Sequence, residues 1–160
     1  MEPLAAQVIS RINQAAELYH RLIIIAAPAG AGKTAALQDI RERTGAPLIN
    51  VNLELSRRLL ELTGRRRALL LPRLLSEIVN ASGSDVVLLD NIELLFDASL
   101  KQDPLRLLQG LSRNKTLVVA WNGSVSGGYL TYAVPEHPEY RRYVIRDLMI
   151  VSPEKSEVRK

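Results

Sequence analysis

One stretch decides the fold of this 160-residue chain: Leu22-Ile23-Ile24-Ile25-Ala26-Ala27-Pro28-Ala29-Gly30-Ala31-Gly32-Lys33-Thr34. Its apolar first half predicts a buried strand, its small residues predict a glycine-rich turn, and Gly-Lys-Thr opens a helix. Such a turn lets backbone N–H groups face a polyphosphate, and the positive end of the new helix attracts the same charge. The alternative is an ordinary strand–turn–helix crossover that contains Gly-Lys-Thr by chance. Because all three parts occur in order, the stretch favours nucleotide binding.

Each residue of the turn has an expected role. Lys33 would reach the outer phosphates and take part in catalysis, and Thr34 would ligate magnesium. Ala27 stands where the pattern usually has its first glycine. The sequence predicts ATP and Mg²⁺ as ligands. The residues expected to contact the nucleotide are Ala29, Gly30, Ala31, Gly32, Lys33, Thr34 and Ala35.

Composition limits the class of protein. The length suits one nucleotide-binding domain, expected over residues 1–151, followed by a charged tail over 152–160. Apolar residues make up 47% and aromatic residues 4% of the chain, which predicts an aliphatic core. No stretch approaches the roughly 20 apolar residues that span a bilayer, so no membrane partner is expected. The chain has no cysteine, and its start lacks the pattern of a signal peptide, which suits a cytoplasmic protein.

Helical and strand patterns alternate along the chain, which predicts a three-layer α/β fold with a parallel sheet. Expected strands are 22–26, 47–52, 85–90, 116–121 and 147–151, with 129–132 as an edge strand or hairpin arm. Expected helices cover 4–19, 33–45, a segment capped by Asn52 and ended by Gly64, a segment through 70–78 whose start Pro72 makes ambiguous, and 104–113. After the last strand only the charged tail remains. The fold would therefore lack a C-terminal helical lid, and a homo-oligomer or a partner would complete the site.

A carboxylate ends the expected strand 85–90. If the strands are parallel, Asp90 lies at the same sheet edge as the glycine-rich turn, where open α/β sheets bind ligands. Its expected role is to hold magnesium opposite Thr34. The alternative, an aspartate that caps a loop, has less support because four apolar strand residues come directly before it.

The residue that would activate water departs from the usual pattern. In the class of P-loop ATPases with a strand inserted between the two motifs, the AAA-like class, a glutamate usually follows the aspartate. Asn91 occupies that position and cannot accept a proton as a carboxylate does. Glu93 either faces the site, if the backbone leaves the strand there, or sits on a helix without a chemical role. The sequence therefore predicts slow hydrolysis or hydrolysis completed by a partner, and leaves open whether ATP is hydrolysed.

Two further residues have alternative interpretations. Asn122 follows a strand at the place where this ATPase class has a polar residue near the γ-phosphate, or it is an ordinary turn residue before Gly123. Arg113 is a candidate arginine finger toward a neighbouring subunit, or a favourable charge at a helix C-terminus. Asn114-Lys115-Thr116-Leu117 begins like a guanine-recognition motif but lacks its aspartate, so guanine specificity is unsupported.

The basic character of the chain is local. Net charge is +4, and the segment 57–73 holds six arginines against Glu61 alone. This segment either binds the phosphates of DNA or RNA, contacts an acidic partner, or is a solvated face. No aromatic residue is interleaved to stack bases. The arginines are Arg57, Arg58, Arg65, Arg66, Arg67 and Arg73.

Four segments resemble BrxF, the small P-loop protein of type III BREX (bacteriophage exclusion) systems. They are 49–60 (INVNLELSRRLL), 89–96 (LDNIELLF), 102–113 (QDPLRLLQGLSR) and 137–143 (HPEYRRY). The resemblance covers nearly the whole chain except the charged tail. It implies a role in anti-phage defence beside other BREX proteins: a methyltransferase, a large ATPase and an alkaline-phosphatase-like protein. It also implies that Lys33, Thr34 and Asp90 are nucleotide and magnesium ligands.

Three functions are therefore expected as alternatives. The first is an ATPase that drives or times the assembly of a defence complex. The second is an adaptor whose ATP state controls assembly without hydrolysis. The third is a DNA-binding accessory subunit that uses the arginine segment.

Overall fold

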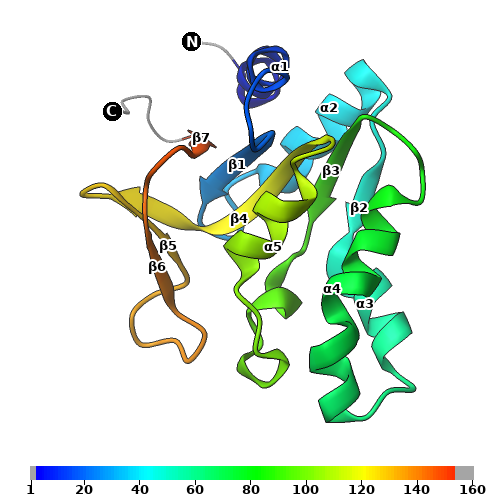
Figure 1. Ribbon diagram of the computed structural model, residues 1–160. Helices are drawn as coiled ribbons and strands as arrows, with labels where there is room; N and C mark the ends of the chain where they lie inside the picture. The colour runs from blue at the N-terminus through cyan, green and yellow to red at the C-terminus, as the bar shows by residue number, and fades with distance from the viewer. Residues whose placement is uncertain (1–2, 154–160) are drawn as a thin grey trace.

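The computed structural model describes residues 3–153, which form a mixed α/β fold around one parallel sheet (Figure 1). Its helices are α1 Leu4–Ala15, α2 Lys33–Thr44, α3 Val51–Leu59, α4 Gly64–Asn80 and α5 Pro104–Leu111, with 3₁₀ turns η1 Glu93–Phe96 and η2 Ala98–Leu100. Its strands are β1 Leu22–Ala27, β2 Leu48–Asn50, β3 Val86–Asp90, β4 Thr116–Ser126, β5 Tyr129–Tyr132, β6 Arg141–Val144 and β7 Met149–Val151. Most of the expected charged tail, residues 154–160, lies outside the described residues. None of the described helices is long and apolar enough to cross a bilayer.

The parallel sheet has the strand order β2-β3-β4-β1-β7. The prediction of a parallel sheet is confirmed, and β4 lies between β1 and β3. Registers place Ala27 of β1 beside Asn122 of β4, and Asn50 of β2 beside Asp90 of β3. The carboxyl ends of β1, β2 and β3 therefore lie at one edge of the parallel sheet, beside Asn122 of β4.

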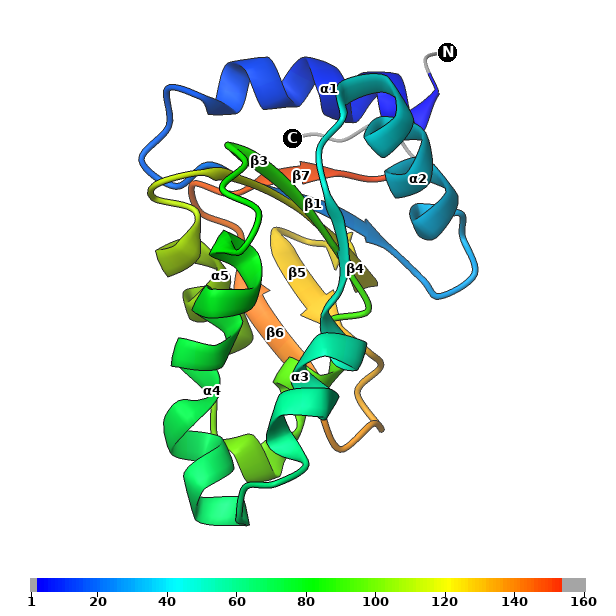
Figure 2. The same cartoon turned by 90° about the vertical axis from the view of Figure 1, so that its right-hand side faces the viewer.

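Helices cover both faces of the sheet, which gives the expected three layers (Figure 2). Successive residues of a strand point to opposite faces, so β1 contributes to two cores. Ile23 and Ile25 pack with α1 and α2, whereas Ile24 packs with α3, α4 and α5. Burial on both faces explains why β1 is apolar along its whole length.

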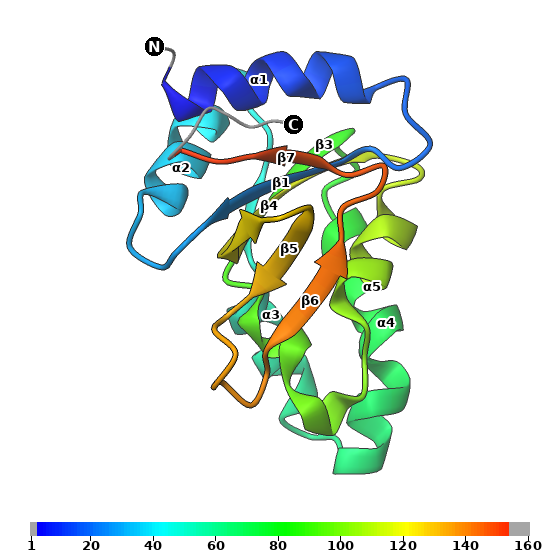
Figure 3. The ribbon, with the colours of Figure 1, turned by 90° about the vertical axis from the view of Figure 1, so that its left-hand side faces the viewer.

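β4 continues past the parallel sheet into an antiparallel hairpin sheet. Its residues 123–126 pair with β5, and β5 pairs with β6 (Figure 3). The sequence indicated β5 as a hairpin arm but not β6. A side chain at Gly123 could not be accommodated, because a Cβ there would lie 1.7 Å from the carbonyl oxygen of Thr131. The same oxygen accepts a 2.9 Å hydrogen bond from Nε1 of Trp121.

Aromatic side chains gather where this hairpin meets the parallel sheet. Phe96 stacks on Tyr132 with ring centroids 3.5 Å apart, and Trp121 contacts Phe96 edge-on at 5.3 Å. Tyr143 of β6 also lies edge-on to Trp121, with ring centroids 6.0 Å apart. The expected aliphatic core is present across the sheet, but the few aromatic residues form a local cluster that anchors the hairpin.

α4 runs through Pro72, which the sequence left as an ambiguous start. A proline has no N–H to donate to the carbonyl four residues earlier, here that of Ala68. Nε2 of Gln102 donates to this carbonyl instead, at 2.8 Å. The helix begins at Gly64, eight residues before the proline, so Pro72 lies in its interior. The arginine triplet lies in its first turns.

The boundaries of α3 correct two expectations. Asn50, not Asn52, caps this helix, because the side chain of Asn50 accepts a 3.1 Å hydrogen bond from the N–H of Leu53. Gly64 does not end it: α3 ends at Leu59, and Gly64 opens α4 after the cap Thr63. The first helix also ends earlier than expected, at Ala15.

Candidate functional site

The glycine-rich turn lies at the carboxyl end of β1 and is exposed from Pro28 to Gly32. Two of its residues need left-handed backbone conformations: φ is 82° at Gly30 and 95° at Gly32. Glycine adopts these angles without steric cost. The sequence-predicted nucleotide contacts, residues 29–35, are therefore gathered in this turn and the first residues of α2.

Lys33 is the first residue of α2 and is only 6% exposed. Its Nζ donates hydrogen bonds of 2.7 Å to the carbonyl oxygens of Ala27 and of Pro28. Burial lowers the pKa of Lys33, while the carboxylates of Asp90 and Glu93 act to raise it. The ammonium is thus held at the base of the turn, within electrostatic reach of both carboxylates.

Thr34 and Asp90 are brought together as expected. The Thr34 hydroxyl donates a 2.7 Å hydrogen bond to Oδ2 of Asp90, which is 8% exposed. Oδ1 of Asp90 accepts from the N–H of Asn91 at 2.9 Å. A hydroxyl and a carboxylate are oxygen ligands of the kind Mg²⁺ prefers, and Mg²⁺ commonly takes one carboxylate with substrate phosphates. Within residues 3–153, no group of three or more His, Cys, Asp or Glu could hold a metal by itself.

Glu93 lies beside this pair because the chain turns sharply after β3. Asn91 has φ of 53°, a left-handed angle that asparagine tolerates better than most residues. Glu93 then starts η1, and its two carboxylate oxygens accept from different amides. Oε1 accepts from Nδ2 of Asn52 at 3.0 Å, and Oε2 from Nδ2 of Asn122 at 2.7 Å. Glu93 thus starts a 3₁₀ turn, and its side chain lies among the polar residues beside Asp90.

Asn52 is a site residue that sequence reasoning missed. Besides donating to Glu93, its Oδ1 accepts from the N–H of Leu94 at 2.8 Å, and its own N–H donates to the carbonyl of Asn91 at 2.8 Å. It therefore fixes both the backbone turn and the side chain of Glu93. The available signal was its position just after β2, whose last residue lies in register with Asp90.

A buried tyrosine lies close to the same carboxylate. Burial raises the pKa of Tyr132, and the charges of Glu93 and Glu139 raise it further. The phenol therefore stays neutral throughout the physiological range. Its ring is stacked on that of Phe96.

Arg113 lies far from this group. It precedes β4, at the amino edge of the sheet, and its guanidinium lies 4.8 Å from the ring centroid of Tyr19. The glycine-rich turn lies at the opposite edge, so Arg113 does not contact the site of its own chain. Tyr19 and His20 also lie at the amino edge, ahead of β1. The six arginines of the basic segment lie on α3 and α4.

No protein-family model and no curated protein matches the chain. Among solved structures, the chain is similar to PCH-2 of C. elegans, with a TM-score of 0.40 and 14% sequence identity. The similarity covers 93% of this chain and 39% of the PCH-2 chain, so the chain spans about two fifths of that protein. A similarity with so low a TM-score does not indicate a function, so only the geometry of the site bears on it.

Proposed function

We propose that the chain is a P-loop domain that binds ATP with Mg²⁺ and hydrolyses ATP slowly. The observation that carries this proposal is the 2.7 Å contact of Thr34 with Asp90, which joins the glycine-rich turn to the carboxylate end of β3. The strand order agrees with it, because β4 separates β1 from β3 as in the AAA-like ATPase class. Magnesium bound at these two oxygens would neutralise phosphate charge.

Lys33 has a defined task in this proposal. Its ammonium now bonds to two backbone carbonyls of the turn itself, at Ala27 and Pro28. Phosphate oxygens are stronger acceptors than backbone carbonyls because they carry charge. Lys33 would exchange these carbonyls for the outer phosphates, and the negative charge would offset the burial that lowers its pKa.

Glu93 is the proposed general base. It replaces the glutamate that usually follows the aspartate, and the left-handed turn at Asn91 brings its carboxylate to the strand ends. The amides of Asn52, in the first turn of α3, and of Asn122, which lies inside β4 and not after a strand or in a turn, fix its orientation. A carboxylate held in this way can accept a proton from a water molecule aligned with the outer phosphate.

One observation favours a second candidate, the adaptor that binds ATP without hydrolysing it. Both oxygens of Glu93 already accept amide hydrogens, at 3.0 Å and 2.7 Å, which lowers their ability to take a proton from water. Each oxygen keeps a further lone pair, so proton transfer is weakened and not blocked. This weakening agrees with slow hydrolysis, or with hydrolysis that a partner completes.

The proposed cellular role rests on the resemblance to BrxF. We propose that the chain acts in an anti-phage defence complex with other BREX proteins, where its ATP cycle drives or times assembly. The turn from Pro28 to Gly32 is exposed in this chain. A second copy or a partner would cover a nucleotide bound there.

Phosphate release by the purified protein separates the candidates. We expect slow release by the wild type, none by Lys33→Ala, and none by Glu93→Gln although Glu93→Gln still binds ATP. Glu61→Gln, an exposed glutamate in the turn after α3, serves as the matched control and should release phosphate like the wild type. ATP binding without any release by the wild type would favour the adaptor. Equal release by Glu93→Gln and the wild type would exclude Glu93 as the base.

A further inference from the structure

α3 and α4 form a helical hairpin that extends away from the sheet. Figures 1 and 2 both show the two helices side by side, with their joining turn at the lower end of the molecule. Buried residues such as Leu55 and Leu75 face the core. The opposite faces of both helices are uncovered in the described chain.

These outer faces carry exposed leucines. Leu60 is 74% exposed and Leu69 is 75% exposed, more than any other large apolar side chain among residues 3–153. Leu53, Arg57 and Leu60 follow at intervals of four and three residues along α3 and its C-cap, which places them on one face. Arg65, Leu69 and Arg73 follow at intervals of four along α4. We name the leucine–arginine surface by its residues: Leu53, Arg57, Leu60, Arg65, Arg66, Leu69 and Arg73.

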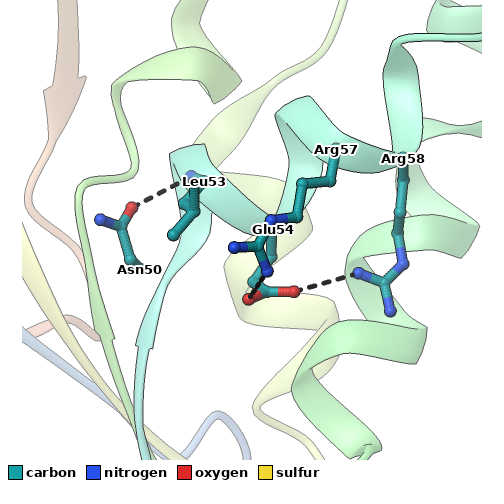
Figure 4. A network of polar contacts seen from close by, with 5 residues as sticks. All are labelled: Asn50, Leu53, Glu54, Arg57 and Arg58. Carbon is teal, nitrogen blue, oxygen red and sulfur yellow. Dashed lines mark hydrogen bonds and ion pairs between the residues drawn. The ribbon is translucent and has the colours of Figure 1, made fainter.

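The charge of this surface is only partly compensated. Between residues 53 and 77 the chain has six arginines and three glutamates, a net charge of +3. Figure 4 shows one glutamate, Glu54, shared by Arg57 and Arg58, each at 3.4 Å. Arg73 pairs with Glu77 at 3.4 Å. Within residues 3–153, the guanidinium groups of Arg65 and Arg66 have no hydrogen-bond or ion-pair partner.

Two of these arginines do not serve the stability of their own helix. Arg65 and Arg66 lie in the first turn of α4, which contains no acidic residue. A helix N-terminus is positive, so cations there are unfavourable and anions favourable. The positive charge is therefore available to a partner.

We propose that the leucine–arginine surface docks an acidic protein segment that presents apolar side chains between its carboxylates. Carboxylates match the uncompensated arginines, and apolar side chains match the exposed leucines. A nucleic acid would match the charge alone: its backbone offers no counterpart to Leu53, Leu60 and Leu69. The segment 53–77 also contains no aromatic residue on which a base could stack. The surface goes beyond the proposed ATP site and uses none of its residues.

A display library of helical peptides, randomised at every position, identifies the chemistry that the surface selects. The library is sorted on the wild-type protein and counter-sorted on the double variant Leu60→Ser and Leu69→Ser. We expect the enriched peptides to be acidic, with apolar residues spaced by three and four positions. Enriched peptides without acidic excess or without that apolar spacing, or no enrichment, would overturn the proposal.

The affinities of one enriched peptide and of a random-sequence DNA duplex are then measured for the wild type and for variants of the surface. They test whether the named leucines and arginines carry the binding. We expect Leu60→Ser, Leu69→Ser and the pair Arg65→Glu with Arg66→Glu each to weaken peptide binding about tenfold, because central apolar and arginine contacts carry most interface energy. Matched controls far from the hairpin, Leu18→Ser and Arg146→Glu, should bind like the wild type. Peptide binding that survives the leucine substitutions, or duplex binding that is tighter than peptide binding, would contradict the proposal. Running the series in Lys33→Ala separates this outcome from a failure of the ATP site.

Discussion

The hydroxyl of Thr34 donates a 2.7 Å hydrogen bond to Oδ2 of Asp90, across 56 positions of sequence. Thr34 is the second residue of α2, the helix after β1, and Asp90 ends β3; β4 lies between these two strands. The contact therefore depends on the strand order and not on local sequence. It places a hydroxyl and a carboxylate where a single cation could bind both, next to the buried ammonium of Lys33.

Asn52→Ala tests how Glu93 is positioned. We expect phosphate release to fall about tenfold with little change in ATP affinity, because one of two charge-assisted hydrogen bonds to the carboxylate is lost. Asn50→Ala, at the N-cap of the same helix, is the matched control. It removes the N-cap and costs about 1 kcal/mol of stability, but it should leave the rate of release unchanged. Equal rates for Asn52→Ala and Asn50→Ala would contradict a positioning role.

Asn91 tests the left-handed turn that carries Glu93. Its φ of 53° suits glycine and strains alanine, and its side chain has no hydrogen-bond partner among residues 3–153. We expect Asn91→Gly to retain stability and phosphate release, whereas Asn91→Ala loses about 1 kcal/mol of stability and also loses activity. Chemical denaturation and phosphate release measure both effects. A more active Asn91→Ala would show that Glu93 does not depend on this backbone angle.

Gly123→Ala tests the close approach of β4 and β5 where the hairpin sheet begins. The added methyl would lie 1.7 Å from the carbonyl oxygen of Thr131, so β5 must move and the Trp121 hydrogen bond must break. We expect a loss of about 1–3 kcal/mol in the free energy of unfolding, typical of overpacking, and a changed near-ultraviolet signal from the single tryptophan. Gly110→Ala in α5 is the control. It meets open space and should raise stability by about 0.5–1 kcal/mol.

Tyr143 makes the free energy of unfolding depend on pH in the alkaline range. Burial and the charge of Asp103 raise the pKa of Tyr143 to about 12, from an ordinary value of 10.0. The folded state therefore keeps its proton where the unfolded state loses it. The stabilisation is complete below pH 10.0 and is lost progressively as the pH rises to about 12.

Tyr143→Phe should reduce this dependence. We expect the free energy of unfolding of the variant to fall less steeply with pH above 10.0 than that of the wild type, because one titrating group is removed. The variant also loses the 3.2 Å hydrogen bond to Asp103, so its stability at neutral pH should be slightly lower. Tyr129→Phe, whose hydroxyl has no such partner within residues 3–153, is the control. Parallel pH curves for Tyr143→Phe and the wild type would contradict this account.

Local sequence signals located much of the fold. The apolar runs of β1 and β3 and the Asp103-Pro104 start of α5 were predicted because period, caps and turn residues act over a few positions. The proximity of Thr34 to Asp90 was also predicted, because parallel strands bring their carboxyl ends to one edge. The strands and the helix start needed only local signals, whereas the Thr34–Asp90 contact needed the parallel arrangement of the strands as well.

The features that were not predicted from the sequence depend on residues far away along the chain. Asn50 and Asn52 are both suitable caps, and only the end of β2 at Asn50 decides which one caps α3 and which one reaches Glu93. α4 continues through Pro72 because Gln102, 30 positions further on by their residue numbers, supplies a donor to Ala68. β6 was not predicted, because it is defined by its pairing with β5 and by the close approach of β5 to β4 at Gly123.

Titration calorimetry of ATP into the wild type and Thr34→Val tests the central claim most directly. We expect the wild type to bind ATP in magnesium buffer, and Thr34→Val to bind at least about tenfold more weakly there but equally well once the metal is chelated, because a methyl cannot ligate the ion. Thr44→Val, which removes a hydroxyl at the far end of the same helix, should behave like the wild type. No heat from the folded wild type with ATP and magnesium, or equal magnesium-dependent affinities of Thr34→Val and the wild type, would contradict the account.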